Sequence, residues 1–565
     1  MTRINFVLSI YFGKRCQLAA IILLIIMVSI IFSPRIAKTT SSPYGDSAVS
    51  DETRSGLIPS SIKPSSHLSS NPKILTQGKE IYNRRCAPCH GTAGDGSGEA
   101  AYLLYPKPRD FTRSEYRLVS TWDGIPTDQD LYQTISRGMP GSSMPSWSHL
   151  PEEDRWALVH YVKNFSKHAM EILPDYDPEE KEELGEGHLI IPSPPEYTKE
   201  MEKHARQLYT KGCAPCHGET GRGDGVKKQE DSSGYPAQPR DLIAGVYKGI
   251  PAPEEVYKRI VLGLPGSPMP SSSYLHGDDG WALTHFILSL SSAQQREKME
   301  MHRYRIIAER TDKLPDHPHA GEWRHVQPVE LHLMPLWWRP GRTATLTVKA
   351  LHDGNEIAIL LQWADDTNNQ TVIRPQDFRD AAAVQFSTRD DPQFFAMGEV
   401  DQQLSIWMWK SDKQTDLDLG FQDVEYVYPN QGIDTYPNLQ RSTLDQPFRN
   451  APTVESDPAF ITAWGAGNIV ANPEPEKAVE SLQANGFGTL RAGPSVDRTV
   501  KAQGDYSIGS YQVVFQKTMN LSGSENEVLQ AGDTISIAFA IWDGSIGDRD
   551  GNKSVTIWQE MYIQP

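Results

Sequence analysis

The sequence is poor in cysteine and in basic residues. It has only 5 cysteines in 565 residues, too few for a disulfide-stabilised scaffold, and the odd number leaves one unpaired. Lysine and arginine number 55 against 72 acidic residues, and the net charge of −17 argues against a general nucleic-acid-binding protein. Hydrophobic residues at 38% and charged residues at 22% exclude a wholly disordered chain and a polytopic membrane protein. At about 150 residues per domain, the length predicts three or four folded units.

Long apolar runs are also scarce, and the clearest lies near the N-terminus. Residues 18–32 are apolar and follow three basic residues, and with Cys16 and Gln17 they reach the lower limit of a spanning helix, which needs roughly 17–25 residues. A cleaved signal peptide is the alternative, although no convincing small-residue cleavage motif follows. We interpret residues 1–33 as a membrane anchor or signal segment. Residues 34–71, rich in Ser and Pro, are predicted to form a flexible tether.

Two Cys-x-x-Cys-His motifs account for four of the five cysteines. This spacing is the attachment signature of c-type haem: the two thiols bond to the porphyrin, and the histidine is the proximal iron ligand. A redox dithiol or half a zinc site would not require the adjacent histidine. The sequence therefore predicts two covalently bound haem c groups at Cys86, Cys89 and His90 and at Cys213, Cys216 and His217.

The sequences around the two motifs are repeated as well. Residues 138–145 match residues 263–270, and both copies continue into an amphipathic helix. Each copy resembles the small monohaem class of cytochrome c, in which a methionine before the last helix is the sixth iron ligand. Met144 and Met269 coincide in the two copies and are predicted as these ligands, whereas Met139 corresponds to Leu264. We interpret residues 72–168 and 198–292 as cytochrome c domains, separated by an acidic linker at 169–197.

Two other repeated pairs have less specific interpretations. His160 and His285 coincide, and we expect them to be ordinary helix histidines, because each iron already has two candidate ligands. Arg109 and Arg240 coincide in a repeated Pro-Arg-Asp sequence. They could pair with haem propionates or form ordinary salt bridges in loops, and the sequence leaves both open.

The C-terminal part of the chain has a different pattern. Residues 293–313 are predicted to form a connecting helix, and from residue 314 short apolar runs alternate with Gly, Pro and Asp. Few helices that could connect parallel strands are visible. Residues 314–565 are therefore predicted to form a mainly antiparallel β-sandwich, following two all-α cytochrome c-like domains. The expected strands are 344–351, 357–363, 381–386, 404–409, 511–515, 535–541 and 554–563.

Six segments of this last domain carry a family resemblance, at residues 358–363, 378–386, 395–398, 406–410, 541–545 and 551–555. By these segments the domain resembles the haem b (gamma) subunit of the type II dimethyl-sulfoxide-reductase family, which includes ethylbenzene, dimethylsulfide, selenate, chlorate and nitrite-oxidising complexes. The resemblance implies one haem b with Met397 and Lys553 as ligands. A lysine ligates iron only as the neutral amine and therefore needs a desolvated site. We expect Val555 and Ile557 to share the face of Lys553, and Phe395 that of Met397.

The prediction is a non-catalytic, extracytoplasmic electron-transfer subunit. The resemblance implies a molybdopterin catalytic subunit and an iron–sulfur subunit as partners, a cytochrome as a further electron partner, and nitrite or nitrate as the favoured substrate of the complex. The alternative is a dihaem cytochrome c fused to a carbohydrate- or protein-binding β-sandwich without haem b. A peroxidase-like enzyme would need an open iron site, which both Met-Pro pairs argue against. Surface tryptophans would carry the alternative, at Trp337, Trp338, Trp407 and Trp409.

Overall fold

The structure is a computed structural model that describes residues 55–166, 187–387, 397–398, 404–420, 422, 427–430, 477–493, 499–519 and 529–565. Arg54–Pro565 form one compact unit. The predicted membrane or signal segment, residues 1–33, lies outside the described residues. So do residues 34–54 of the predicted tether and 169–186 of the acidic linker. In the described part of the chain, no helix has the length and apolar character needed to cross a membrane.

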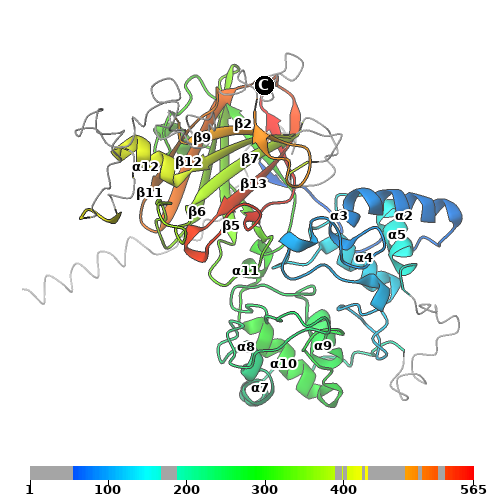
Figure 1. Cartoon of the computed structure of the whole chain (residues 1–565). Coiled ribbons are helices and arrows are strands. Elements are labelled where there is room, and N and C mark those ends of the chain that lie inside the picture. The colour runs from blue at the N-terminus through cyan, green and yellow to red at the C-terminus, as the bar shows by residue number, and fades with distance from the viewer. Residues whose placement is uncertain are drawn as a thin grey trace, which may run out of the picture. The chain divides into compact units, whose positions relative to one another are not determined.

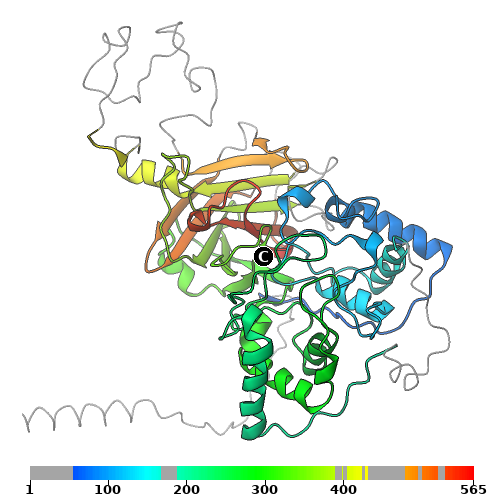
Figure 2. The same cartoon turned by 60° about the horizontal axis from the view of Figure 1, so that its bottom comes forward.

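The first cytochrome-like domain is built from α2 (Pro72–Arg85), α3 (Ala87–His90), α4 (Asp128–Arg137) and α5 (Glu152–Lys163). Asn71 caps α2 by accepting hydrogen bonds from the N–H groups of Lys73 and Ile74. Helices α2 and α5 pack closely (Figure 1). Their contact requires a glycine in α2, because a Cβ at Gly78 would lie 2.2 Å from the carbonyl oxygen of Ala157. Figure 2 shows these helices, coloured blue to cyan, gathered in one group.

The second cytochrome-like domain repeats this order. Its helices are α7 (Lys199–Gly212), α8 (Ala214–His217), α9 (Pro253–Leu262) and α10 (Asp278–Ser289). The two domains share an apolar cluster in which Val119 of the first packs with Tyr257 and Val261 of the second. Residues 187–197 of the predicted linker run between them: the N–H of Leu189 donates to Ser120, and Trp281 donates to the carbonyl of Pro192.

The segment before α2 is not a free tether. Strand β1 (Gly56–Leu57) pairs with strand β2 (Tyr304–Arg310) of the C-terminal domain. Further along, Arg155 and Trp156 of α5 donate to the carbonyl groups of Ser61 and Ser66. The prediction of a flexible tether is therefore wrong for residues 55–71, because α5 supplies donors that satisfy the backbone of this segment.

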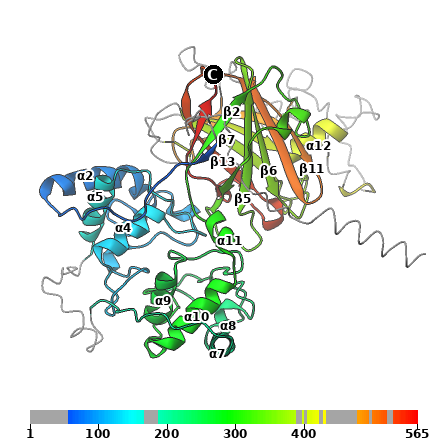
Figure 3. The same ribbon diagram turned by 180° about the vertical axis from the view of Figure 1, so that it is seen from behind.

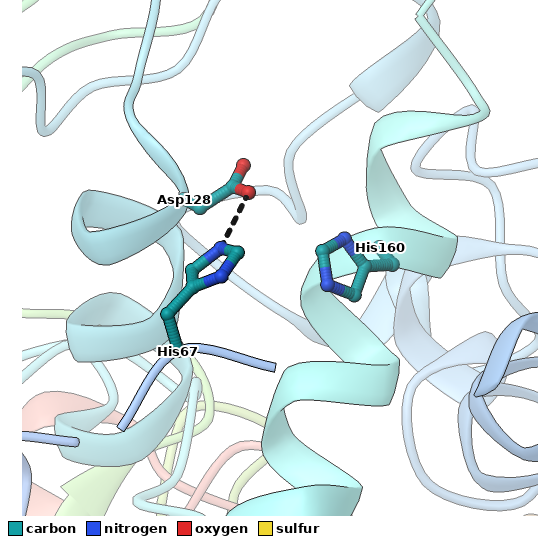
Figure 4. Close-up of side chains that lie close together, drawn as sticks. All are labelled: His67, Asp128 and His160. Atoms are coloured by element: carbon teal, nitrogen blue, oxygen red, sulfur yellow. Dashed lines mark hydrogen bonds and ion pairs between the residues drawn. The ribbon is translucent and has the colours of Figure 1, made fainter. Parts of the chain in front are cut away.

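His67 is a further attachment point of the same segment. Its Nε2 lies 3.4 Å from Asp128, and His160 of α5 faces this pair while its own Nε2 bonds the carbonyl of Leu68 at 2.6 Å (Figure 4). Lys163 already forms an ion pair with the other carboxylate oxygen of Asp128. The three side chains therefore anchor the segment to α5, and His160 is the ordinary helix histidine that the sequence predicted.

The C-terminal domain is a large mixed sheet. Among the described residues its main path runs β10-β9-β8-β7-β13-β15-β2-β5-β6-β12-β11. The strands on this path and beside it are β2 (Tyr304–Arg310), β3 (Val329–His332), β4 (Met334–Pro335), β5 (Thr345–His352), β6 (Glu356–Ala364), β7 (Ala381–Ser387), β8 (Leu404–Lys410), β9 (Val479–Ala484), β10 (Arg491–Ala492), β11 (Lys501–Tyr506), β12 (Ser510–Thr518), β13 (Thr534–Trp542), β14 (Ser554–Val555) and β15 (Gln559–Ile563). Helix α12 (Ser411–Leu419) lies beside β11 (Figure 3).

One prediction for this domain needs correction. The connecting helix expected over 293–313 is short, because α11 covers Ala293–Lys298 and β2 follows at Tyr304–Arg310. Most strand pairs are antiparallel, as expected, but β2 lies between β15 and β5 and is parallel to both, so the sheet is mixed. The chain pairs here with strands about 40 and 250 residues away, which a local sequence pattern does not reveal.

Candidate functional site

In the first domain, the Cys-x-x-Cys-His motif forms one tight helical turn. Cys86 caps α2, and the N–H of His90 donates to the carbonyl of Cys86 at 2.8 Å. Burial raises the pKa of both Cys86 and Cys89 to about 12, so the free thiols are protonated. Burial lowers the pKa of His90 to about 4, which keeps the imidazole neutral as a metal ligand requires.

The orientation of His90 is set by its neighbours. Its Nδ1 lies 3.0 Å from the carbonyl oxygen of Arg109, which can only accept, so the ring donates there and leaves Nε2 free. The ring also stacks on Phe111 with centroids 4.5 Å apart. A ligand histidine is commonly held in this way through its other ring nitrogen. The residues therefore fit a proximal haem ligand.

The predicted ligands of the first domain line one cavity. It is lined by Cys86, Cys89, His90 and Met144, and also by Met139. The loop that carries both methionines is closed by a hydrogen bond from the N–H of Met139 to the carbonyl of Met144 at 3.0 Å. Because both side chains reach the cavity, the choice of Met144 still depends on its repetition at Met269.

The second domain repeats this local structure with one difference. The N–H of His217 donates to Cys213 at 2.9 Å, and the N–H of Leu264 donates to Met269 at 3.0 Å. Burial and the charge of Lys248 lower the pKa of His217. Its Nδ1, however, is buried without a hydrogen-bond partner in the described structure. The two predicted proximal histidines therefore differ in whether the ring nitrogen Nδ1 has a hydrogen-bond partner.

A large cavity lies in the C-terminal domain. Its volume is about 1050 Å³, which is large enough for a cofactor. Strands β7 and β13 line it with four alanines, at 381, 383, 538 and 540, where larger side chains would fill the space. Basic residues surround it, namely Arg374, Arg379, Lys410, Lys413, Lys477, Arg491 and Arg549. These alanines were not predicted as cavity-lining residues, although their alternation on two strands is visible in the sequence.

Met397 and Lys553 meet in this cavity. The Lys553 Nζ lies 3.9 Å from the Met397 Sδ, although the residues are 156 positions apart. Met397 has a φ of +65°, uncommon for a residue other than glycine. A thioether sulfur and a neutral amine nitrogen are both possible ligands of a haem iron, and these two side chains would hold it if a haem is bound in this cavity.

Burial makes the amine of Lys553 easier to deprotonate, because it lowers its pKa to about 8 against the opposing charge of Asp550. Its Nζ lies 4.9 Å from the ring centroid of Trp542, a contact that favours the charged amine instead. Val555, in the short strand β14 that follows Lys553, lines the same cavity, whereas Ile557 lies beyond that strand. Phe395, which we expected beside Met397, lies outside the described residues.

The two cavities share an apolar cluster and are joined by main-chain hydrogen bonds. Cys89 and Leu104 of the first cytochrome domain pack in the same cluster as Met397 and Trp542. The N–H of Leu336 donates to the carbonyl of Lys553, and the N–H of Tyr105 donates to Leu336, both at 2.9 Å. A short series of backbone hydrogen bonds thus leads from one candidate site to the other.

Four buried carboxylates lie in the sheet domain, one of them, Asp548, in the lining of the large cavity, and were not anticipated. Asp380 accepts hydrogen bonds from Gly544 at 2.8 Å and Asn369 at 2.7 Å, and so joins two loops. Burial and the charge of Asp365 raise its pKa to about 7. Burial also raises the pKa of Asp365 to about 6 and that of Asp548 to about 7. Asp365, Asp380 and Asp543 lie close enough that one oxygen of each is within 4.8 Å of the others.

Two of the four tryptophans expected on a binding surface lie in the core instead, whereas Trp337 and Trp338 are partly exposed. Trp407 and Trp409 are 0% and 1% exposed and belong to the main core of the sheet. Trp337 is half-buried against Tyr105, with centroids 5.3 Å apart. The alternation of the strands turns Trp407 and Trp409 inward, so this observation no longer supports the alternative function.

Comparison with family models matches three regions of the chain. Residues 74–162 match the model of subunit III of cbb3-type cytochrome c oxidase, and residues 203–291 match cytochrome c. Residues 321–554 match the ethylbenzene dehydrogenase model. The matched regions agree with the two helical domains and the sheet domain of the structure.

Curated relatives resemble less than half of the chain. The respiratory nitrate reductase heme subunit ORF7 of Haloferax mediterranei is 23% identical over 44% of this chain and 69% of its own length. The chlorate reductase gamma subunit of Ideonella dechloratans is 21% identical over 43% of this chain and 77% of its length. The dimethylsulfide dehydrogenase gamma subunit of Rhodovulum sulfidophilum is 23% identical over 38% and 57%. The chain thus resembles the haem-carrying gamma subunits of dimethyl-sulfoxide-reductase-family complexes, joined to two cytochrome c domains.

Proposed function

We propose that the chain is a non-catalytic electron-transfer subunit that carries two haem c groups and one haem b. It would relay electrons between a molybdopterin and iron–sulfur oxidoreductase and a cytochrome. The observation that carries this proposal is the approach of Lys553 to Met397, at 3.9 Å in a cavity of about 1050 Å³. Haem iron, when bound, supplies one-electron redox chemistry.

Each residue has a defined part in this proposal. The thiols of Cys86, Cys89, Cys213 and Cys216 would attach the two c haems, and His90 with Met144 and His217 with Met269 would be their axial ligands. Lys553 would act as a neutral amine opposite Met397, and the alanines of β7 and β13 leave room between the strands. Cys89 and Met397 pack against one apolar cluster, which would keep water away from the path between the first cytochrome site and the b site.

The partners and location follow from the relatives. Gamma subunits of chlorate reductase and dimethylsulfide dehydrogenase, and a heme subunit of a nitrate reductase, support a molybdopterin partner. We favour a nitrite- or nitrate-converting complex. Attachment of c-type haem supports an extracytoplasmic location, and the apolar run at 18–32 would hold the chain at the membrane.

A haem assay tests this function. The pyridine haemochrome spectrum of the purified chain should show covalent and extractable haem in about a two-to-one ratio. Met397→Ala and Lys553→Ala should each lose the extractable haem and retain both covalent haems. Absence of extractable haem from the unaltered chain would support the alternative of a dihaem cytochrome with a different β domain. Retention of haem b in both variants would show that other residues ligate it.

A further inference from the structure

The cavity of the first cytochrome domain is lined by positive charge alone. Among the described residues its charged lining consists of six cations, and no aspartate or glutamate lines it. This is unexpected in a chain with a net charge of −17. Two of the six cations come from the second domain. The six are Arg85, Lys107, Arg109, Arg117, Arg240 and Lys248.

The four cations of the first domain already have partners. Arg117 forms an ion pair with Asp231 at 2.9 Å, and Arg109 lies 3.9 Å from Glu115. Lys107 donates to the carbonyl of Ala101 at 3.0 Å. Arg85 lies over the ring of Trp147, 5.7 Å from its centroid. These contacts account for the cations that the first domain itself supplies.

Arg240 and Lys248, from the second domain, have no such partners. Within the described residues neither side chain forms an ion pair or hydrogen bond, and Arg240 is 9% exposed with a buried, unsatisfied Nε. Burial and the charges of Arg342, Arg117 and Arg137 lower the pKa of Arg240 to about 9. Burial and the charge of Arg240 lower the pKa of Lys248 well below its usual range, against the opposing charge of Asp231, which already pairs with Arg117. Buried cations without an ion-pair partner of their own are costly, so an anion in this cavity would stabilise both.

Contacts with the first domain hold both residues in place. The guanidinium of Arg240 lies against Gly141, with its Nε 3.4 Å from where a Cβ would stand. Gly141 belongs to the loop that carries Met144. Arg137, at the end of α4, donates to the carbonyl of Lys248 at 3.3 Å and is itself held by Glu300 at 2.6 Å. The second domain therefore presents two cations at the distal side of the first cavity.

The same contact exists in the opposite direction. Arg109, the repeat counterpart of Arg240, lies against Gly266 of the second domain, with its Nη1 3.0 Å from where a Cβ would stand. Each repeated arginine thus contacts the methionine loop of the other domain. Only Arg240 lacks an acidic partner, because Arg109 lies near Glu115. The two contacts are therefore equivalent in position, but only the arginine that reaches the first domain has no acidic partner.

We propose that Arg240 and Lys248 bind the propionate carboxylates of the haem held by the first cytochrome domain, across the boundary between the domains. The haem attached at Cys86 and Cys89 brings two carboxylates, and a guanidinium pairs with a carboxylate through two parallel hydrogen bonds. The inference rests on the proposed haem attachment. It resolves the two interpretations that the sequence left open for Arg240, because this residue serves the haem of the other domain.

Redox titration of the full chain tests this assignment. A nearby positive charge favours ferrous over ferric haem, so Arg240→Gln should raise the ferric-to-ferrous ratio of the first c haem about tenfold at a fixed potential, a shift of about 59 mV for one electron. Lys248→Gln should act in the same direction, and Arg240→Lys should recover most of the shift. Arg222→Gln is the matched control, because it removes an exposed charge from the same domain.

A second variant identifies which haem responds. Met269→His should displace the redox couple of the second c haem. Arg240→Gln should shift the midpoint potential of the first c haem, which Met269→His leaves unchanged. Movement of the second couple instead would show that Arg240 serves its own domain, and no movement would show a structural role; either result overturns the proposal. If Arg240→Gln does not fold, Lys248→Gln decides by the first couple alone, because the charge of Lys248 also acts on His217 of the second domain. An unmoved first couple in Lys248→Gln would then overturn the proposal. Absence of covalent haem from the unaltered chain would instead refute the proposed function.

Discussion

The two cytochrome domains share their motif and local geometry but differ in their surroundings. His90 donates to the carbonyl of Arg109, whereas the Nδ1 of His217 has no partner in the described structure. The first cavity also receives cations from the second domain, and its Cys89 packs with residues of the sheet domain. The duplication thus preserved the candidate haem ligands, while contacts between domains made the two sites unequal. The first domain lies at the junction of all three folded parts.

The largest expected effect is on the haem midpoint potential and concerns the loops that carry the predicted methionine ligands. The two domains differ in these loops at Met139 and Leu264. Met144→Ala removes the predicted thioether ligand and should lower the midpoint potential of the first haem by on the order of 100 mV, because axial ligands set haem potentials. Met139→Leu reproduces the second domain and should leave the potential nearly unchanged. Redox titration with absorption spectra measures both. A larger effect from Met139→Leu would identify Met139 as the ligand.

The second-largest expected effect is a pH dependence of the stability of the sheet domain. Burial raises the pKa of Asp380 to about 7, above the value of about 3.9 expected in an unfolded chain. The folded domain therefore holds a proton that the unfolded chain releases. This contribution to stability is complete below about pH 4 and is lost as the pH rises through 7.

Urea unfolding at pH 5 and pH 8 measures this contribution. The free energy of unfolding of the sheet domain should fall by on the order of 2 kcal/mol between these pH values because of Asp380 alone. Asp380→Asn should reduce the pH dependence by about that amount, even though an amide satisfies its two donors less well. Asp366→Asn, at an exposed neighbour, is the control and should leave the dependence unchanged. An unchanged slope in Asp380→Asn would contradict the raised pKa.

The smallest expected effect concerns one exposed histidine–aspartate pair at each cytochrome domain. His67 is 56% exposed and pairs with Asp128 in the first domain, and His204 pairs with Asp279 at 2.8 Å in the second. Such exposed pairs contribute about 0–1 kcal/mol. His67→Ala and His204→Ala should each lower the thermal stability of their own domain slightly, as measured by calorimetry. A large loss of thermal stability in His67→Ala would contradict this expectation. If added zinc ions also changed the thermal stability of the unaltered chain, the cluster of His67, Asp128 and His160 would be shown to bind metal.

Features that depend on short stretches of sequence could be predicted. The Cys-x-x-Cys-His turns need only four or five consecutive residues, and most of the expected strands occur within one or two residues of their predicted bounds. The juxtaposition of Met397 and Lys553 followed from a family resemblance and could not be derived from spacing, because 156 residues separate the two. Strand β2 was missed because its neighbours in the sheet are distant in the chain.

The sequence alone determined that the chain holds two repeated cytochrome c motifs and a strand-rich domain, because covalent haem attachment and strand alternation are local patterns. Tertiary structure decided which residues share a cavity. It placed Arg240 and Lys248 of one domain at the site of the other, turned Trp407 and Trp409 into the core, and attached residues 55–71 to α5. These outcomes depend on how buried charges and apolar faces are satisfied across domain boundaries, and that is settled only when the domains pack together.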